Sequence, residues 1–449
     1  MTVPPRTPGT RVRIIATNDL LGTITPLPTS TGLSGSVDGV DALVRSERAE
    51  GPTLWLDSGD LTGGPLWSLT GRRSWDIFSD LTIDAMAVGN HELDEGQGPF
   101  RTGHAKLPFP LLCADVPQLG LASSALLATQ GGAIGVIGLT HPAIDHFAAA
   151  PQPQDAAHAV QCETHNLRRA GAKWIIALQH DGVDWWPQGG SIAARPDRWA
   201  RSIAPWVQSV DIVLGGHTLA AWSGQVGDTT LGQADPFAVS ALVVDLLDDG
   251  PHVRGFVYIA DDVEVSPIRQ EAADLLVRAG TQIIGHTDVS LTTAPRRPGE
   301  RSLTRTVAEA VRVEVETEAA LLMPNAFFTQ APIDGAIAQL GPGPVSRLDI
   351  HRLFPFPDDE LTVIELVDDE FERVVAAHDH TTSPANRSGD ADWWNWNRTP
   401  AGWSTTRKHP RTVAIAKFSL PLIEQWIARD LTTERRESAR STLEHWFAR

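Results

Sequence analysis

The chain has 449 residues, a hydrophobic fraction of 42%, a charged fraction of 20% and a formal net charge of -18 at pH 7. This length predicts two domains, each able to bury its own core. The acidic balance argues against a broad basic surface for nucleic acid, and no apolar run is long enough to cross a bilayer. We therefore expect a water-soluble protein with no nucleic-acid or membrane partner, while its oligomeric state stays open.

The first residues and the two cysteines are the features from which we predict the cellular compartment. The first residues, MTVPPRTPGTRVR, contain no apolar segment with a cleavage site, so the sequence predicts a cytoplasmic protein. Cys113 and Cys162 have no C-x-x-C spacing. Two unpaired thiols are the expected outcome, and neither is a metal candidate.

Short apolar runs alternate with polar or helix-compatible stretches through the first half of the chain. The helix-compatible stretches include GVDALVRSERAE at 39–50 and ETHNLRRAGA at 163–172. The runs that predict strands are RVRIIAT, TLWLD, DAMAV, PLLCA, AIGVIGL, KWIIAL and DIVLG. This alternation predicts an α/β layered domain, and residues 224–260 predict hairpin-linked strands that close it.

A domain boundary is expected near residue 262, which divides the chain into domains 1–262 and 263–449. The segment PIRQEAADLLVRAG at 267–280 predicts a connecting helix, and the remainder predicts a second α/β domain. One stretch from Thr381 to Arg411 is polar and rich in Trp, and we expect a long loop there. Long loops in compact domains are usually functional or disordered.

Five polar motifs directly follow strand-like runs. In chain order they are Asp19 in ATNDLLG, Asp60 in LDSGD, Asn90 and His91 in VGNHELD, His180 in LQHDG, and His217 in LGGHT. Because ligands gather beyond the carboxyl ends of strands in α/β sheets, we expect all five at one edge. Each motif alone is more often an ordinary turn, but five in order favour a metal site. Carboxylate, amide and imidazole ligands suit zinc, manganese or iron, so a hydrolytic centre is predicted.

With these motifs the chain resembles the calcineurin-like metallophosphoesterases and, within them, the two-domain 5′-nucleotidase family. The runs that carry the resemblance are DSGDLTGG, IDAMAVGNHELDEG, LLCADV and AIGVIGLTHP, followed in the second half by IIGHTDVSL, DIHRLFPFPDDELTVIELVDDEF and RTVAIAKF. The resemblance implies a four-layer αββα metallophosphoesterase sandwich. It also implies a smaller α/β, 5′-nucleotidase-like C-terminal domain that binds the substrate.

The resemblance further implies two metals bridged by Asp60. One metal site would be completed by the ligands Asn90, His180 and His217, which are all present. The other would use Asp19, Asp60 and two further ligands, at positions where this chain has Leu21 and Leu219. Leucine has no lone pair to donate, so we expect one tightly bound divalent ion and a degenerate second site.

Two further residues match a catalytic dyad in this resemblance. His91 and Asp94, in GNHELD, correspond to the pair whose imidazole stabilises charge or protonates the leaving group. A packed histidine beside a metal ligand is the alternative for His91. One ion alone can still activate a water molecule, so hydrolysis is weakened in expectation but not excluded.

The residues expected to bind the substrate differ from those usual in the family. Its nucleotidases usually carry an Asn-Gly-Gly-x-Arg-like loop, but the corresponding stretch here, PNAFFTQAPIDGAI, has no Arg. Arg398, Arg407 and Arg411 could replace it, or they could be solvated loop charges. The late stretch also carries indoles that could pack in a core or contact an aromatic or apolar substrate, namely Trp393, Trp394, Trp396 and Trp403.

Three functions remain open from the sequence. The first is a phosphomonoesterase acting on a nucleotide or another aromatic phosphate, as in nucleotide catabolism. The second is a metalloenzyme of the same fold that acts on a non-phosphate bond in specialised metabolism. The third is a catalytically dead binding protein. Phosphate release separates the first function from the others, and metal content separates the second from the third.

Overall fold

The computed structural model shows a chain that forms two compact units. The first unit comprises Met1–Gly63, Arg72–Asp184 and Ala194–Ala273, and the second comprises Gly64–Gly71, Trp185–Ala193 and Asp274–Arg449. The predicted division at residue 262 stays a prediction. The structure describes residues 3–29, 32–70, 75–144, 150–188, 191–260, 262–292, 299–322, 339–355, 360–367, 369–374, 402–405, 410–416, 423, 430–431 and 433–449.

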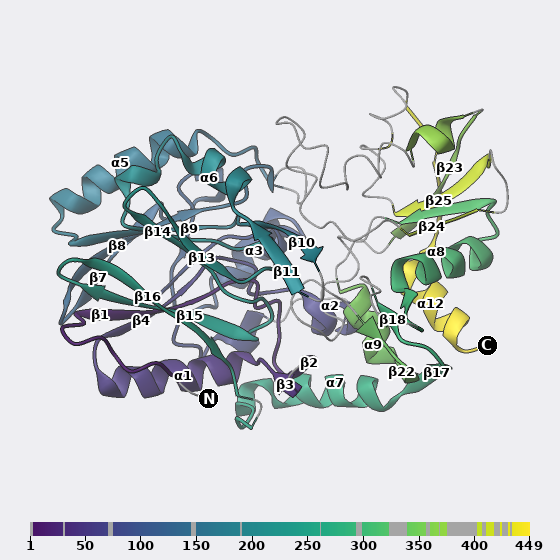
Figure 1. Ribbon diagram of the computed structural model, residues 1–449, viewed down its shortest axis with the longest axis horizontal. Coiled ribbons are helices and arrows are strands. Elements are labelled where there is room, and N and C mark those ends of the chain that lie inside the picture. Colours follow the sequence, from purple (N-terminus) through teal and green to yellow (C-terminus); the bar gives the residue numbers. More distant parts are fainter. Residues whose placement is uncertain are drawn as a thin grey trace. The chain divides into compact units, whose positions relative to one another are not determined.

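Two six-stranded sheets form the centre of the first unit (Figure 1). The first sheet has the order β16 (Gly250–Tyr258), β15 (Ser240–Leu247), β1 (Val12–Thr17), β4 (Thr53–Asp57), β5 (Ala85–Ala87) and β6 (Leu111–Leu112). The second has the order β13 (Trp222–Val226), β14 (Thr229–Gln233), β12 (Ile212–Leu214), β9 (Trp174–Gln179), β8 (Gly132–Leu139) and β7 (Ser124–Thr129). Four neighbouring strands of each sheet are parallel. They are β1, β4, β5 and β6 in the first sheet and β14, β12, β9 and β8 in the second.

The central strands of the two sheets are buried on both faces, and their composition reflects this burial. Every residue of β1, β4 and β9 is buried, which explains why each strand is mostly apolar rather than alternating between apolar and polar residues. Side chains from both sheets share one core, and Ile14, Leu56, Ile176 and Leu214 belong to it.

Helices cover the outer faces of the two sheets, which gives four αββα layers (Figure 1). On the first sheet α1 (Val37–Glu50) packs near β4, and on the second α5 (Ala156–Arg169) packs on β7, β8 and β9. Both helices start at a side-chain cap. Ser36 accepts from the backbone N–H of Gly39, and Asp155 accepts from Ala157 and His158. The predicted α/β sandwich is therefore confirmed.

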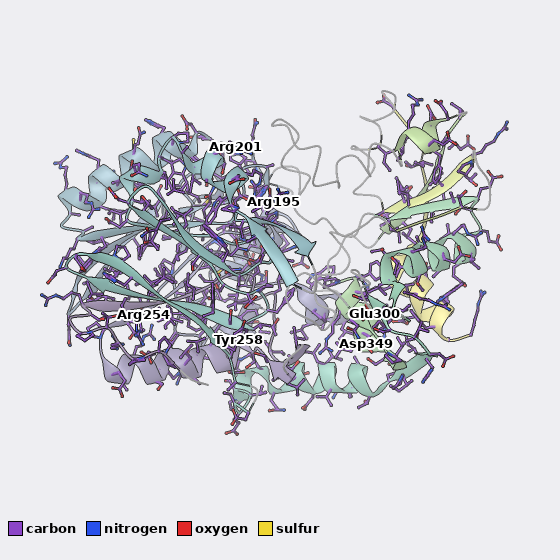
Figure 2. The ribbon with its side chains drawn as sticks, viewed as in Figure 1. Arg195, Arg201, Arg254, Tyr258, Glu300 and Asp349 are labelled. Carbon is purple, nitrogen blue, oxygen red and sulfur yellow. The ribbon has the colours of Figure 1, made fainter. Side chains whose placement is uncertain are left out.

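Further elements lie within residues 3–260, of which Gly64–Gly71 and Trp185–Ala193 belong to the second unit. The strands predicted over 224–260 are present as β13 to β16, and Figure 2 labels Arg254 and Tyr258 on the last of them. The remaining elements are β2 (Leu27–Thr29), β3 (Gly32–Ser34), α2 (Gly64–Thr70), η1 (Trp75–Phe78), η2 (His91–Leu93), α3 (Gln97–His104), η3 (Pro117–Leu119), β10 (Asp184–Gln188), β11 (Ser191–Arg195), α6 (Asp197–Ile203) and η4 (Val207–Ser209).

The predicted connecting helix is present as η5 (Pro267–Arg269) followed by α7 (Gln270–Thr281). The second unit contains a five-stranded sheet with the order β24 (Gly402–Thr405), β20 (Ala319–Leu322), β25 (Thr412–Ala416), β23 (Glu360–Glu365) and β26 (Thr433–Ser438). Its other elements are β17 (Ile283–Thr287), β18 (Leu291–Thr292), β19 (Arg301–Ser302), α8 (Leu303–Glu314), β21 (Gln339–Leu340), β22 (Gly343–Ser346), α9 (Arg347–Leu353) and α12 (Ala439–Phe447).

The five-stranded sheet carries a core on each face. Ala320 and Leu322 belong to one core, whereas Ala319 and Leu321 belong to the other. This alternation follows from the two-residue period of a strand and makes β20 apolar on both sides. The second α/β domain predicted from the sequence is thus observed.

The long loop predicted from Thr381 to Arg411 needs one correction. Gly402–Thr405 forms β24, which pairs with β20 and places Trp403 opposite Leu321. Trp and Thr favour strands, but the partner strand lies far back along the chain, so no local pattern revealed the pairing. The other candidate substrate residues lie outside the described residues: Trp393, Trp394, Trp396, Arg398 and Arg407.

The helices were also compared with the requirements for spanning a membrane. Within the ranges described above, no helix combines the length and the apolar character needed to cross a bilayer. The cytoplasmic location stays a prediction.

Candidate metal centre

The five polar motifs all lie just beyond the carboxyl ends of parallel strands, but they are divided between the two sheets. Three follow β1, β4 and β5 of the first sheet, and two follow β9 and β12 of the second. The expectation of a single edge is corrected to two stacked edges. These edges meet, because the backbone N–H of His217 donates to Asp19 Oδ2 at 2.8 Å.

A compact set of potential ligands forms where the two edges meet. The ligand atoms of Asp60, His180 and His217 all lie within 4.8 Å of one another, and the three side chains are buried. Asn90 Oδ1 lies 2.9 Å from His217 Nδ1 and 3.2 Å from His180 Nε2. In the part of the chain that the structure describes, no other group of His, Cys, Asp and Glu meets this criterion.

The chemistry of these four side chains fits a divalent metal. His180 donates from Nδ1 to the carbonyl oxygen of Ser58 at 2.8 Å, and its Nε2 lies 3.0 Å from Asp60 Oδ2. A backbone carbonyl on one ring nitrogen commonly orients the other nitrogen toward a metal. One carboxylate, one amide oxygen and two imidazoles suit zinc, manganese or iron.

Burial and mutual attraction shift the pKa values of this group strongly. Burial alone would lower the pKa of His180, but the adjacent carboxylate of Asp60 outweighs it and raises the pKa to about 10. For Asp60, burial would raise the pKa, whereas the His180 and His91 imidazoles lower it to about 2. Burial also raises the pKa of Asp19 to about 6, despite the attraction of His180. Within the cluster, the Asp60 carboxylate and the His180 imidazole therefore stabilise each other's charged form.

The loops that carry these residues adopt an unusual backbone. Left-handed φ angles are costly for residues with a Cβ, and they persist only where the surroundings impose them. Five non-glycine residues on the loops after β1, β4 and β12 have such angles, namely Asp19 (50°), Leu21 (45°), Asp60 (62°), His217 (69°) and Leu219 (58°). Strained backbone of this kind gathers at functional sites in proteins, so its clustering here supports these loops as the candidate site.

A glycine lets two of these loops approach closely. A Cβ added to Gly89 would lie 2.1 Å from Asp60 Oδ1 and 2.6 Å from the Asp60 backbone nitrogen. Both distances are far below any normal carbon contact. Only glycine at position 89 therefore allows the Asp60 and Asn90 loops to meet as they do.

The two leucines that the resemblance assigns to a second metal position are buried. Leu21 and Leu219 are 1% and 3% exposed, and neither offers a ligand atom. The Asp19 carboxylate stands outside the ligand cluster, where its Oδ2 accepts from Asn18 Nδ2 at 2.7 Å and from the backbone of His217. The role of Asp19 as a metal ligand stays a prediction.

The predicted catalytic dyad has the expected pairing. His91 Nδ1 lies 2.9 Å from Asp94 Oδ2, and His91 Nε2 lies 3.9 Å from Asp60 Oδ2. The backbone N–H of His91 also donates to Asp60 Oδ1 at 2.9 Å. The imidazole is therefore oriented by one carboxylate beside another that belongs to the ligand cluster.

Comparison with known proteins places this geometry in a family. Residues 12–221 match the profile of the calcineurin-like phosphoesterase family, and this segment contains all four clustered ligands. The chain contains a calcineurin-like phosphoesterase domain. The resemblance to the calcineurin-like phosphoesterases predicted from the sequence is thus confirmed, and a 5′-nucleotidase relative is consistent with the narrower family.

Known proteins resemble the chain beyond the phosphoesterase domain. It is 30% identical to the 5′-nucleotidase of Mus musculus over 200 residues, which are 41% of this chain and 32% of that protein. It is 23% identical to the endonuclease YhcR of Bacillus subtilis over 414 residues, which are 82% of this chain and 32% of that protein. The chain therefore spans about a third of the length of these two relatives.

Two solved structures share the fold over nearly the whole chain. A 5′-nucleotidase precursor from Thermus thermophilus has a TM-score of 0.74 and 16% identity, and the match covers 97% of this chain and 96% of that chain. The sulfate thiohydrolase SoxB from the same species has a TM-score of 0.75 and 15% identity, and the match covers 100% and 95%. At this identity the likeness shows the fold alone.

Two residues beside the cluster, Glu92 and His141, were not predicted from the sequence. The carboxylate of Glu92 accepts from the backbone N–H groups of Asp60, Gly89 and Thr62 at 2.9 to 3.1 Å, so it joins the two loops that carry Asp60 and Asn90. His141 lies against His217, with ring centroids 4.2 Å apart. A signal for His141 was present, since it follows an apolar strand run in the same way as the five motifs.

Proposed function

We propose that this chain is a metal-dependent hydrolase with one tightly bound divalent ion. Its substrate would be the phosphomonoester of a nucleotide or another aromatic phosphate. The observation that carries the proposal is the buried cluster of Asp60, Asn90, His180 and His217 at the carboxyl ends of two sheets. A relative whose name is 5′-nucleotidase supports the substrate class.

Each residue of the cluster would have a distinct task. Asp60, Asn90, His180 and His217 hold the ion, which would supply Lewis-acid activation of water and of the substrate oxygen. Asp94 fixes the proton of His91 on Nδ1, so that Nε2 exchanges protons with the substrate. In this role the imidazolium of His91 protonates the leaving oxygen as the ester bond breaks.

The substrate residues proposed for this function rest on the sequence alone. Indoles contribute large rigid contact area and suit the stacking of a base, which makes Trp393, Trp394, Trp396 and Trp403 candidates. Arg398 and Arg407 are the corresponding candidates for the phosphate. A role in nucleotide catabolism would follow from this substrate class.

A second candidate function is the hydrolysis of a bond other than a phosphate ester. Leu21 and Leu219 favour it, because they leave the second metal position without the ligands that a two-ion phosphatase uses. A protein of the same fold is named a sulfate thiohydrolase, so the architecture is compatible with other bonds.

The experiment combines metal counting with a substrate panel. Protein loaded with zinc or manganese and then dialysed should contain about one ion per chain and release phosphate from nucleoside monophosphates or an aryl phosphate. His217→Ala should lose the ion and the activity, whereas the surface variant His165→Ala should keep both. Bound metal without phosphate release would favour the second candidate. Wild-type protein that binds no metal would contradict both.

A further inference from the structure

One buried histidine at the metal centre has no role in the proposed function. His141 follows β8 at the same carboxyl edge as the motifs that carry His180 and His217, and it is 2% exposed. Its ring centroid lies 4.2 Å from that of His217, and the two ring planes are inclined by 40°. The two imidazoles are therefore in face contact.

His141 does not join the ligand cluster itself. The backbone N–H of Ala143 donates to His141 Nδ1 at 3.1 Å, so the lone pair of this nitrogen is engaged and the neutral ring carries its proton on Nε2. Its ring nitrogens also stand outside the group of ligand atoms that lie within 4.8 Å of one another. A neutral, protonated Nε2 is not a metal ligand.

The backbone of His217 does not by itself fix the orientation of the His217 ring plane. The terminal torsion of a histidine side chain has a broad energy profile, so the ring plane is set by its surroundings rather than by a staggered minimum. The backbone N–H of His217 is fixed by Asp19, and its Nδ1 faces Asn90 Oδ1 at 2.9 Å. The contact on the ring face limits rotation of the imidazole about its bond to Cβ.

We propose that His141 is a positioning residue for metal binding, whose ring packs on His217 and fixes the plane in which Nδ1 faces the ion. This inference rests on the proposed function, because it requires His217 to be a ligand. The flat face of the ring performs the task, and the bond from the Ala143 N–H to Nδ1 holds the His141 ring in place.

The test compares variants that keep or remove the flat face. His141→Phe keeps a ring, His141→Leu keeps a similar volume without one, and His141→Ala removes both. Titration of the metal-free protein with Co²⁺ measures the dissociation constant, and the visible absorption of bound Co²⁺ reports the coordination geometry. His165→Ala on the surface of α5 is the matched control, and thermal unfolding identifies any variant that fails to fold.

We expect His141→Phe to bind Co²⁺ within about threefold of the wild type with the same spectrum, and His141→Ala to bind about tenfold more weakly with an altered spectrum. His141→Leu should resemble the Ala variant, which keeps the test valid if His141→Ala does not fold. Equal weakening by Phe and Leu would overturn the inference, because the nitrogens would then matter. Unchanged binding in the Leu and Ala variants would overturn it as well.

A different result would show that the proposed metal site itself is wrong. If His217→Ala binds Co²⁺ as tightly as the wild type, His217 is not a ligand, whatever the His141 variants do. The His217 variant therefore tests the site, and the comparison of Phe with Leu at position 141 tests the positioning role.

Discussion

Two leucines decide how much of the metal centre this chain can form. Leu21 and Leu219 lie two residues after Asp19 and His217, and their φ angles of 45° and 58° are close to those of the ligand-bearing turns. Both side chains are buried, and we propose that they take the place of two ligands of the second ion. A carboxylate pair alone would hold an ion there only weakly.

The double variant Leu21→His and Leu219→His should bind a second ion and gain activity on an aryl phosphate, because two ions can clamp the attacking and leaving oxygens. Each single variant should gain less, since one added imidazole leaves the site incomplete. Elemental analysis and phosphate release are the measurements, with the exposed Leu33→His as the control. If the ion count stays at one, the turns do not present these side chains to a common metal.

Gly89 gives a second prediction at the scale of a single residue. Gly89→Ala should weaken metal binding by about tenfold or more, because the added methyl group collides with the Asp60 carboxylate and moves it. Gly98→Ala is a matched control, since its Cβ would meet nothing within 4 Å and alanine favours the helix α3. Calorimetric titration with Mn²⁺ compares the two variants. Equal affinities would show that the Asp60 loop can move without loss of the site.

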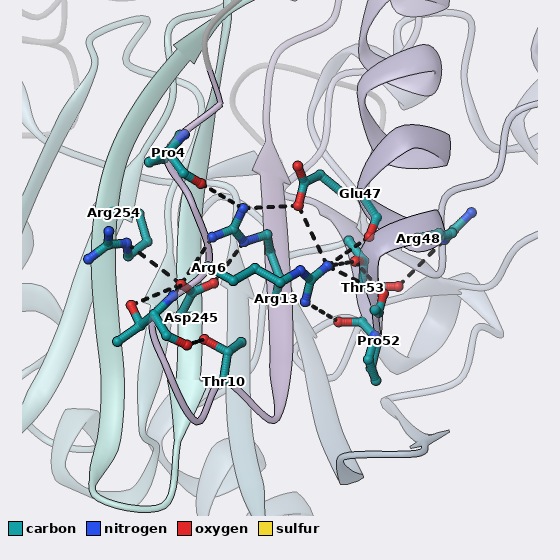
Figure 3. Close-up of polar contacts among 12 residues, drawn as sticks. Pro4, Arg6, Thr10, Arg13, Glu47, Arg48, Pro52, Thr53, Asp245 and Arg254 are labelled. Carbon is teal, nitrogen blue, oxygen red and sulfur yellow. Dashed lines mark hydrogen bonds and ion pairs between the residues drawn. The ribbon is translucent and has the colours of Figure 1, made fainter.

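At the scale of elements, a buried charge network joins three pieces of the first unit (Figure 3). Arg13 on β1 donates to both carboxylate oxygens of Asp245 on β15, at 2.7 and 3.0 Å, and to Glu47 Oε2 on α1 at 2.9 Å. Arg13 and Asp245 are 1% and 0% exposed. Breaking such a pair leaves an uncompensated buried charge.

Asp245→Asn should lower the free energy of unfolding by about 3 to 5 kcal/mol at neutral pH. Burial would raise the pKa of Asp245, but the hydrogen bonds from Arg13 and Thr7 outweigh it and lower the pKa below its ordinary value. The stabilisation is therefore present above about pH 4 and is lost as the pH falls through the lowered folded pKa.

Denaturant unfolding from pH 7 into the acid range measures this contribution. The difference between the wild type and Asp245→Asn should shrink as the pH falls below about 4. The exposed Asp228→Asn variant should follow the wild type throughout. A difference that stays constant with pH would mean that the charge of Asp245 is not what stabilises the fold.

The sequence predicted some elements well and others not at all, for physical reasons. Buried parallel strands such as β1 and β9 are mostly apolar, and a polar motif at their carboxyl end is visible in the local sequence. The pairing of β24 with β20 and the bond from His217 to Asp19 depend on residues far apart in the chain. No local pattern encodes such contacts, and the left-handed φ angle of Leu21 is likewise imposed from outside.

At the scale of the whole molecule, the two units have separate cores, and the candidate ligands belong to only one of them. Ile14 and Leu178 lie in the core between the two large sheets, whereas Leu303 and Leu361 lie in a core of the second unit. A ligand stabilises only the part of a protein whose folded state binds it. Metal should therefore act on the two units unequally.

Scanning calorimetry should show two transitions, of which only one moves to higher temperature with metal. At a free Mn²⁺ concentration of about 100 times the dissociation constant, the first unit should gain about 2.7 kcal/mol. His217→Ala should abolish the shift, and His165→Ala should preserve it. A single transition that moves as a whole would mean that the two units unfold as one cooperative body.

The turns at Leu21 and Leu219 also bear on how this scaffold changes over evolutionary time. A leucine gains nothing from a left-handed backbone, so the turn must be shaped by its neighbours, such as the bond from the Leu21 N–H to the Asp60 carbonyl at 2.8 Å. At Leu21 the backbone is thus fixed by a main-chain bond that does not involve the side chain. Descendants of one ancestor could exchange histidine and leucine here without refolding, and so drift between different chemistries on an inherited frame.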